Sequence, residues 1–178
     1  MKIKHLIVGP LLTNCYVLIS DREAAVVDPG GGLKRIFQEI EKNRAKLNYI
    51  ILTHYHWDHV FGALKLKEKT GAKIFIHKEE KDFIKFKPDY FLNEGEEIKI
   101  GEDSLKVVHT SGHSKGGICL LGNGFIFTGD TLFGDGVGRT DLPGGSQKDL
   151  ENSLKKLEKI IKPGTKIYPG HGPIFTKP

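Results

Sequence analysis

A heptapeptide at residues 53–59, Thr-His-Tyr-His-Trp-Asp-His, constrains the fold and chemistry of this chain more than any other stretch. Residues 47–52 form an apolar, β-prone run that predicts a buried strand. Residues 60–69 predict a helix. The heptapeptide therefore lies where a strand ends and a helix begins, which is where open α/β sheets bind their ligands. Its three histidines and one carboxylate indicate a metal site, with His54 and His56 on one side of an extended segment.

Strand and helix patterns continue on both sides of this stretch. In the first half, strands are predicted at 3–8, 14–19, 24–27, 47–52 and 73–76, and helices at 33–44 and 60–69. In the second half, strands are predicted at 96–100, 104–109, 117–121, 124–128 and 165–168, and a helix at 147–161. The charged segment 77–87 is expected to be a short exposed helix and 88–95 a loop. This order predicts an α/β fold with two sheets packed face to face and helices outside.

Length and composition indicate a single domain over residues 1–178. The formal charge of +5 comes from scattered lysines, not from a compact basic run interleaved with aromatic residues, so no nucleic-acid partner is predicted. No apolar run reaches signal-peptide or membrane-spanning length, which predicts a cytoplasmic protein without a membrane partner. Cys15 and Cys119 lie in apolar runs without CxxC spacing and are expected to be buried free thiols.

Three further candidate ligands, His113, Asp130 and His171, follow apolar strands in glycine-containing loops. Taken singly each is weak, because a lone histidine after a strand is more often a surface residue than a ligand. In the heptapeptide, Asp58 and His59 continue into the turn and can face a second metal. The joint ligand set is His54, His56, Asp58, His59, His113, Asp130 and His171. Imidazoles and carboxylates without cysteine suit Zn(II), Fe(II) or Mn(II) and argue against a structural zinc cluster.

This motif order, HxHxDH followed by a glycine-flanked histidine, Gly-Asp and a late Gly-His, resembles that of the metallo-β-lactamase-fold hydrolases. Residues 53–60 and 129–133 look most like glyoxalase II, the hydroxyacylglutathione hydrolases. Residues 138–145 look like the short, single-domain branch. The resemblance implies an αββα sandwich with two metals at one edge. It assigns His54, His56 and His113 to the first ion, Asp58, His59 and His171 to the second, Asp130 to both, and Asp28 to support of the ligands.

The resemblance also implies a thioesterase that cleaves a small anionic acyl thioester similar to S-lactoylglutathione. A hydroxide bridging the two divalent ions, Zn(II) before Fe or Mn, would attack the carbonyl carbon, and Asp58 would orient this nucleophile. Arg139 falls where the family places a basic residue that grips the carboxylate of the thiol. Its alternative role is an ion pair with Asp141. Tyr55 and Trp57 are expected to be packing residues that fix the turn.

Two departures from the family leave the substrate open. The helical C-terminal domain that supplies glutathione-binding residues in full-length glyoxalase II is not expected, since the sequence ends soon after the last ligand motif. A tyrosine that the family uses two positions after Arg139 is replaced by Asp141. The alternative functions are a persulfide dioxygenase with one iron, held by His54, His113 and Asp130, and another ester or lactone hydrolase of the same fold.

Overall fold

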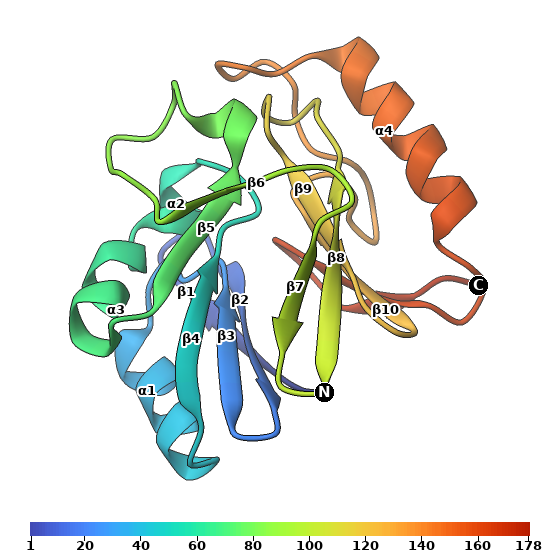
Figure 1. Ribbon diagram of the computed structural model, residues 1–178. Coiled ribbons are helices and arrows are strands. Elements are labelled where there is room, and N and C mark those ends of the chain that lie inside the picture. Colours follow the sequence, from blue (N-terminus) through green and yellow to red (C-terminus); the bar gives the residue numbers. More distant parts are fainter.

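Two six-stranded sheets pack face to face in the computed structural model, which describes residues 1–178 (Figure 1). The first sheet contains β1 (Lys2–Val8), β2 (Thr13–Ser20), β3 (Glu23–Val27), β4 (Lys46–Ile51), β5 (Lys73–His77) and β6 (Tyr90–Leu92), in that order. The second contains β12 (Phe175–Thr176), β11 (Lys166–Pro169), β10 (Phe125–Gly129), β9 (Ile118–Leu121), β8 (Asp103–His109) and β7 (Glu97–Ile100). The helices are α1 (Leu33–Lys42), α2 (Trp57–Val60), α3 (Ala63–Thr70) and α4 (Gln147–Ile160).

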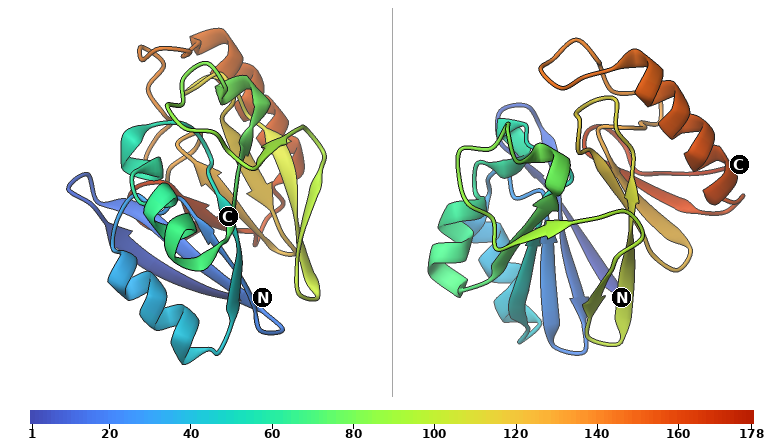
Figure 2. Two further views of the ribbon diagram at one scale, coloured as in Figure 1. Left: turned by 60° about the vertical axis from the view of Figure 1, so that its left-hand side comes forward. Right: turned by 45° about the horizontal axis from the view of Figure 1, so that its top comes forward.

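Side chains alternate along β2 between two cores, so all eight residues of this strand are buried. Tyr16 and Leu18 belong to the core between the sheets. Val17 and Ile19 belong to the core between the first sheet and helices α1 and α3. A third core, which includes Leu157 of α4, lies between α4 and the second sheet. The layers are therefore helix, sheet, sheet and helix, as predicted (Figure 2).

The single helix predicted at residues 60–69 is two helices, and α2 begins inside the heptapeptide. Gly62 separates them: its backbone N–H donates to the carbonyl of Pro29 at 2.8 Å. A Cβ at Gly62 would lie 2.4 Å from that same oxygen, so the close approach requires glycine. Asp58 and His59 consequently lie on a helical turn that the Gly62–Pro29 contact fixes against the end of β3.

The prediction of an exposed helix at residues 77–87 is wrong. Only the three-residue 3-10 turn η1 (Lys78–Glu80) is helical there. Glu80 is fully buried, and its carboxylate accepts hydrogen bonds from the backbone N–H groups of Tyr55 and Gly116. A charged side chain that binds two distant loops does not belong to a solvated helix face.

Two short edge strands also differ from the prediction. The loop expected at 88–95 contains β6, whose three residues pair in parallel with β5. The two residues of β12 pair with β11 beyond the last predicted strand. Both strands are too short for periodicity to reveal them, and Pro88 and Asn93 on either side of β6 are loop signals.

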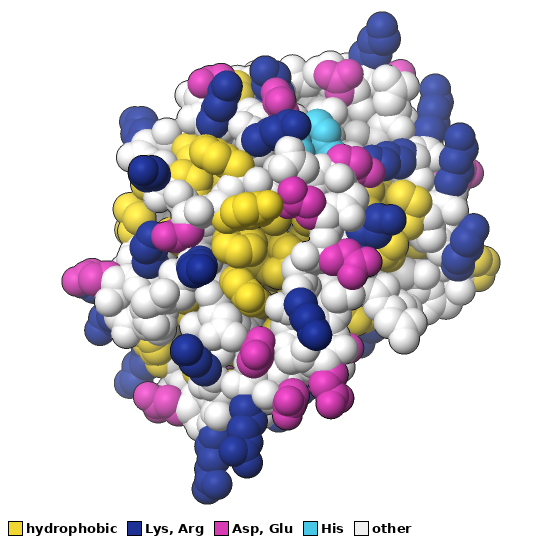
Figure 3. Space-filling view, viewed as in Figure 1, with side chains coloured by type: hydrophobic (Ala, Val, Ile, Leu, Met, Phe, Trp, Pro, Cys, Tyr) yellow, Lys and Arg dark blue, Asp and Glu magenta, His cyan; other side chains and the backbone are white.

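The surface agrees with the scattered charges of the sequence. On the face shown in Figure 3, Lys and Arg side chains are spread singly among Asp and Glu, around a hydrophobic area over the region of β5 and β6. Tyr90 and Phe91 of β6 are partly exposed. None of the four α-helices combines the length and apolarity that crossing a membrane requires.

Candidate metal centre

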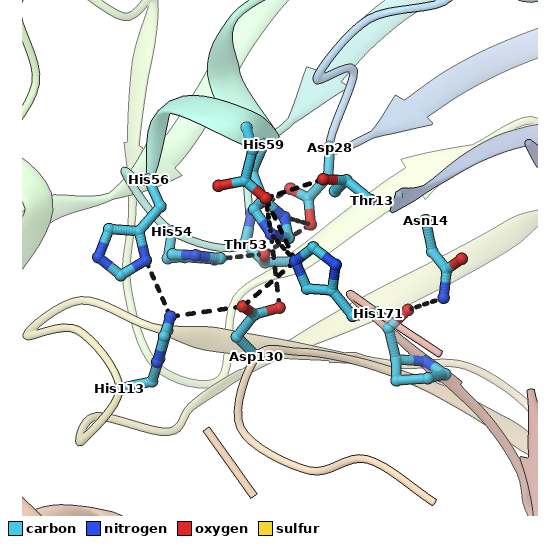
Figure 4. Close-up of polar contacts among 12 residues, drawn as sticks. Thr13, Asn14, Asp28, Thr53, His54, His56, His59, His113, Asp130 and His171 are labelled. Atoms are coloured by element: carbon cyan, nitrogen blue, oxygen red, sulfur yellow. Dashed lines mark hydrogen bonds and ion pairs between the residues drawn. The ribbon is translucent and has the colours of Figure 1, made fainter. Parts of the chain in front are cut away.

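The predicted ligands meet at one edge of the sandwich, where strands of both sheets end (Figure 4). The heptapeptide follows β4, His113 follows β8, Asp130 directly follows β10, and His171 lies two residues after β11. In three overlapping groups, the ligand atoms all lie within 4.8 Å of one another. The groups are His54–His56–His113, Asp58–His59–His171 and His54–His59–Asp130. The structure thus brings all seven residues together, in the two trios that the resemblance implies, with Asp130 beside both.

Asp28 fixes the orientation of two histidines from behind. One carboxylate oxygen accepts the backbone N–H of Thr53 at 2.8 Å, and the other accepts the Thr53 hydroxyl at 2.7 Å and Nδ1–H of His59 at 2.9 Å. The Thr53 hydroxyl donates its only proton to Asp28. It must therefore accept the hydrogen bond from Nδ1–H of His54 at 3.0 Å. Both histidines therefore carry their proton on Nδ1 and present the lone pair of Nε2 to the site.

Backbone carbonyls set the same tautomer in two further histidines. Nδ1–H of His113 donates to the carbonyl of Arg139 at 2.8 Å, and Nδ1–H of His171 donates to the carbonyl of Leu11 at 3.1 Å. Their Nε2 lone pairs also face the site. His56 differs, because its Nδ1 is the nitrogen that lies 2.8 Å from Nε2 of His113.

This arrangement of acceptors fits a bound cation. Nε2 of His59 lies 3.3 Å from Nε2 of His171, and Oδ2 of Asp58 lies 3.3 Å and 3.2 Å from these two nitrogens. Three lone-pair atoms this close repel one another unless a positive charge lies among them. Nε2 of His54 and Oδ1 of Asp130 are buried without a hydrogen-bond partner, which is costly unless another ligand satisfies them. The donor set, five imidazoles and two carboxylates, suits Zn(II) and related divalent ions.

Gly170 shows how closely the last loop approaches this centre. A Cβ at position 170 would lie 2.1 Å from Oδ1 of Asp130 and 2.9 Å from Cε1 of His59. The Gly170 N–H donates to the carbonyl of Gly129 at 2.7 Å, which ties the loop after β11 to the end of β10. Glycine is therefore required here for the loop to carry His171 into the site.

Comparison with known proteins identifies the family. Residues 8–171 match the description "Metallo-beta-lactamase superfamily". The chain belongs to the metallo-beta-lactamase superfamily. The probable metallo-hydrolase YqgX of Bacillus subtilis is 33% identical, over 97% of this chain and 91% of its own length. Hydroxyacylglutathione hydrolase GloC of Haemophilus influenzae is also 33% identical, over 99% of this chain and 93% of its own length. The crystal structure of TTHA1623 in a di-iron-bound form matches with a TM-score of 0.87 and 29% identity, over 97% and 94% of the two chains.

As a member of the metallo-beta-lactamase superfamily, the protein is a metal-dependent hydrolase, and the electrostatics of its site suit cations. Burial holds the pKa of His54 well below its usual range and lowers that of His56 to about 4, with help from neighbouring histidines. Burial opposes protonation of His59 too, but the carboxylates of Asp130 and Asp28 raise its pKa to about 9. His54 and His56 are thus neutral at pH 7, whereas the carboxylates around His59 stabilise a positive charge at the second trio, carried by a proton or by a metal ion.

A cavity of about 450 Å³ opens onto this metallo-beta-lactamase centre. Arg139 lines it, but its guanidinium makes two 2.6 Å hydrogen bonds to the carboxylate of Asp141, which is the alternative that the sequence left open. Tyr55 packs as predicted: its ring stacks on Phe83 at 4.9 Å and its hydroxyl donates to a backbone carbonyl. The prediction for Trp57 is wrong, because this side chain is 53% exposed and lines the cavity.

Sequence reasoning missed three residues that hold the ligands. The hydroxyl of Thr13 donates to Oδ2 of Asp58 at 2.8 Å. Tyr16 donates its hydroxyl proton to the carbonyl of Pro169 at 2.6 Å and so fixes the end of β11. Glu80 ties the heptapeptide to the loop after His113. A buried acid within a 3-10 turn and polar residues in a buried strand carry no local signal of these roles.

Proposed function

We propose that this chain is a thioesterase of the glyoxalase II type that works with two divalent ions, of which Zn(II) is the first choice and Fe or Mn the alternatives. The observation that carries the proposal is the presence of two complete ligand trios with Asp130 beside both. The similarity to GloC, a hydroxyacylglutathione hydrolase, supports the reaction, and the di-iron-bound form of TTHA1623 supports the two-metal count.

In this proposal His54, His56 and His113 hold the first ion. Asp58, His59 and His171 hold the second, and Asp130 contacts both ions. Asp28 binds no metal and instead sets the tautomers of the ligands through its bonds to Thr53 and His59. Substitution of such a supporting residue typically weakens metal binding by about 10–100-fold.

When bound, the two ions would polarise the thioester carbonyl and lower the pKa of a bound water to about 7. The Asp58 carboxylate is a proton acceptor beside the position where this water would bind. Oδ2 of Asp58, held by the Thr13 hydroxyl, faces the centre of the site and can orient the attacking water through its proton. The leaving thiolate needs little acid assistance, so the absence of a general acid among the cavity residues does not oppose this chemistry.

A persulfide dioxygenase with one iron is the alternative from another reaction class. It would use His54, His113 and Asp130 and would leave the second trio without a function. Here the second trio converges as closely as the first, and its histidines are held as firmly by hydrogen bonds. These observations favour the two-metal hydrolase.

Metal analysis of the purified protein, together with an assay on S-lactoylglutathione, tests the proposal. We expect about two divalent ions per chain and thioester hydrolysis without oxygen consumption. In the Asp130→Ala variant, both the second metal equivalent and most of the turnover should be lost. A single iron together with oxygen uptake on glutathione persulfide would refute the hydrolase assignment, and full activity of Asp130→Ala would refute the shared role of Asp130.

A further inference from the structure

The rim of the cavity above the metal centre is apolar and exposed. Trp57 and Leu11 are each 53% exposed and line the cavity together with Leu142 and Pro143. Exposed apolar surface beside a reaction site is typical of a ligand-binding wall. We infer that this rim binds an extended, uncharged acyl chain of the thioester substrate. The inference rests on the proposed thioesterase function and adds the substrate class.

Two further apolar side chains close to the rim in sequence are exposed. Phe61, 75% exposed, lies one helical turn after Trp57, and its backbone N–H donates to the Trp57 carbonyl at 2.9 Å. Leu12, 65% exposed, follows Leu11. The rim is therefore flanked in sequence by two further large, exposed apolar side chains.

The backbone of this rim is strained. Leu12 has φ of 57°, in the left-handed region that costs a residue with a Cβ about 1–2 kcal/mol. The carbonyl of the preceding Leu11 accepts the bond from Nδ1–H of His171, so the same turn orients a ligand and presents apolar side chains. Strain of this kind is concentrated at functional sites, where surrounding contacts maintain it.

Asp141 offsets the charge of the one basic side chain that lines the cavity. Arg139 is the one Lys or Arg that lines the cavity, and its Nε and Nη2 each donate a hydrogen bond to the carboxylate of Asp141 at 2.6 Å. Both side chains of this pair are more than 60% exposed, so water screens the pair and Asp141 holds Arg139 only weakly. The remaining guanidinium N–H groups can still donate, but the negative charge of Asp141 reduces the attraction of Arg139 for a substrate carboxylate, whereas an uncharged acyl chain needs no such attraction.

A series of thioesters with the neutral thiol N-acetylcysteamine tests the inference on the Zn(II)-loaded protein. Each methylene that becomes half-buried on the rim should raise kcat/KM about twofold, so octanoyl should exceed acetyl by about 60-fold. A flat or falling series would overturn the inference while leaving the thioesterase function intact. Absence of hydrolysis for every thioester, S-lactoylglutathione included, would instead refute the proposed function. An equal gain with S-octyl thioacetate would place the apolar group on the thiol and overturn the acyl assignment.

Two variants connect the selectivity to the rim. Trp57→Ala should lower the octanoyl-to-acetyl ratio at least fivefold; this ratio is insensitive to partial loss of metal, which lowers both rates. Leu64→Ala, at an equally exposed leucine on α3 outside the cavity, is the matched control and should leave the ratio unchanged. Asp141→Ala should free Arg139 and raise the rate on glutaryl relative to pentanoyl thioester. Equal ratios in wild type and Trp57→Ala would overturn the rim assignment.

Binding can also be measured without turnover, because Trp57 is the single tryptophan of the chain. Titration with octanamide, a neutral product mimic, should shift the Trp57 emission to shorter wavelength in a saturable manner, since the ring leaves water. Acetamide at the same concentration should cause no shift. Identical responses to the two amides would contradict an apolar acyl site at the rim.

Discussion

Replacing Glu80 with alanine should loosen two loops of the metal centre at once. Glu80 is fully buried, and one carboxylate oxygen accepts the Tyr55 N–H at 2.8 Å while the other accepts the Gly116 N–H. Tyr55 lies between two of the predicted histidine ligands, and Gly116 lies three residues after a third. One side chain from η1 therefore joins the heptapeptide of the first sheet to a loop of the second sheet.

The magnitude follows from the groups left without a partner. The buried N–H of Gly116 and the part-buried N–H of Tyr55 each lose their acceptor, at a cost of about 1–3 kcal/mol, so the sum is about 2–6 kcal/mol. A value near 4 kcal/mol lowers the Tm of a domain of this size by roughly 8–16 °C. Typical domains have a total stability of about 5–15 kcal/mol, so the variant should still fold at 25 °C.

Thermal unfolding of the metal-free protein by calorimetry measures this effect without involving the ions. Glu79→Ala is the matched control, because its carboxylate makes only a surface ion pair with Lys115 at 3.2 Å and its loss should change Tm little. A Glu80→Ala variant with a Tm within about 2 °C of the parent would refute the reasoning. It would mean that water reaches the two N–H groups and replaces the carboxylate.

Three further predictions follow from contacts at and near the site. His171→Ala should lower the metal content by about one ion per chain and spare the first trio, as measured by metal analysis. Asp28→Asn places an amide N–H₂ or a single acceptor opposite His59, so the apparent affinity for Zn(II), measured with a competing chelator, should fall by about 10–100-fold. Burial raises the pKa of Cys119 to about 12 and that of Cys15 above its usual range, so neither folded thiol should react with a disulfide reagent at pH 8 until denaturant is added.

The convergence of the candidate ligands was predictable because each of their motifs is local. His113, Asp130 and His171 each follow an apolar strand and lie beside a glycine, and both signals are visible in a short window of sequence. In this fold the strands that carry them end at one edge, so motifs far apart in the chain meet there. The structure confirms the two-sheet sandwich, and the fold explains why separate weak signals became one strong pattern.

The role of Glu80 was not predictable because it depends on contacts that are distant in sequence. Its partners lie 25 and 36 residues away. Viewed locally, residues 77–87 are a charged segment, and charged segments usually cover exposed helices.

Trp57 is the opposite case. Its position among ligands suggested packing, but α2 begins at this residue and turns the indole toward solvent and the cavity. The hydrophobic pattern predicted that the helix begins at residue 60, and such a pattern cannot locate a helix start to within one turn.

Two strained residues link the metal centre to the substrate rim. Asp28 and Leu12 both have positive φ, 51° and 57°, and neither is glycine. The carboxylate of Asp28 is held by long-range hydrogen bonds from Thr53 and His59, which offset this strain. Leucine has no such compensation, so the contacts around Leu11 and His171 must maintain the turn. The same surroundings that fix a histidine ligand therefore also hold the apolar rim outward. The turn at Leu11 and Leu12 thus orients His171 through a backbone carbonyl and places the exposed side chain of Leu11 at the cavity.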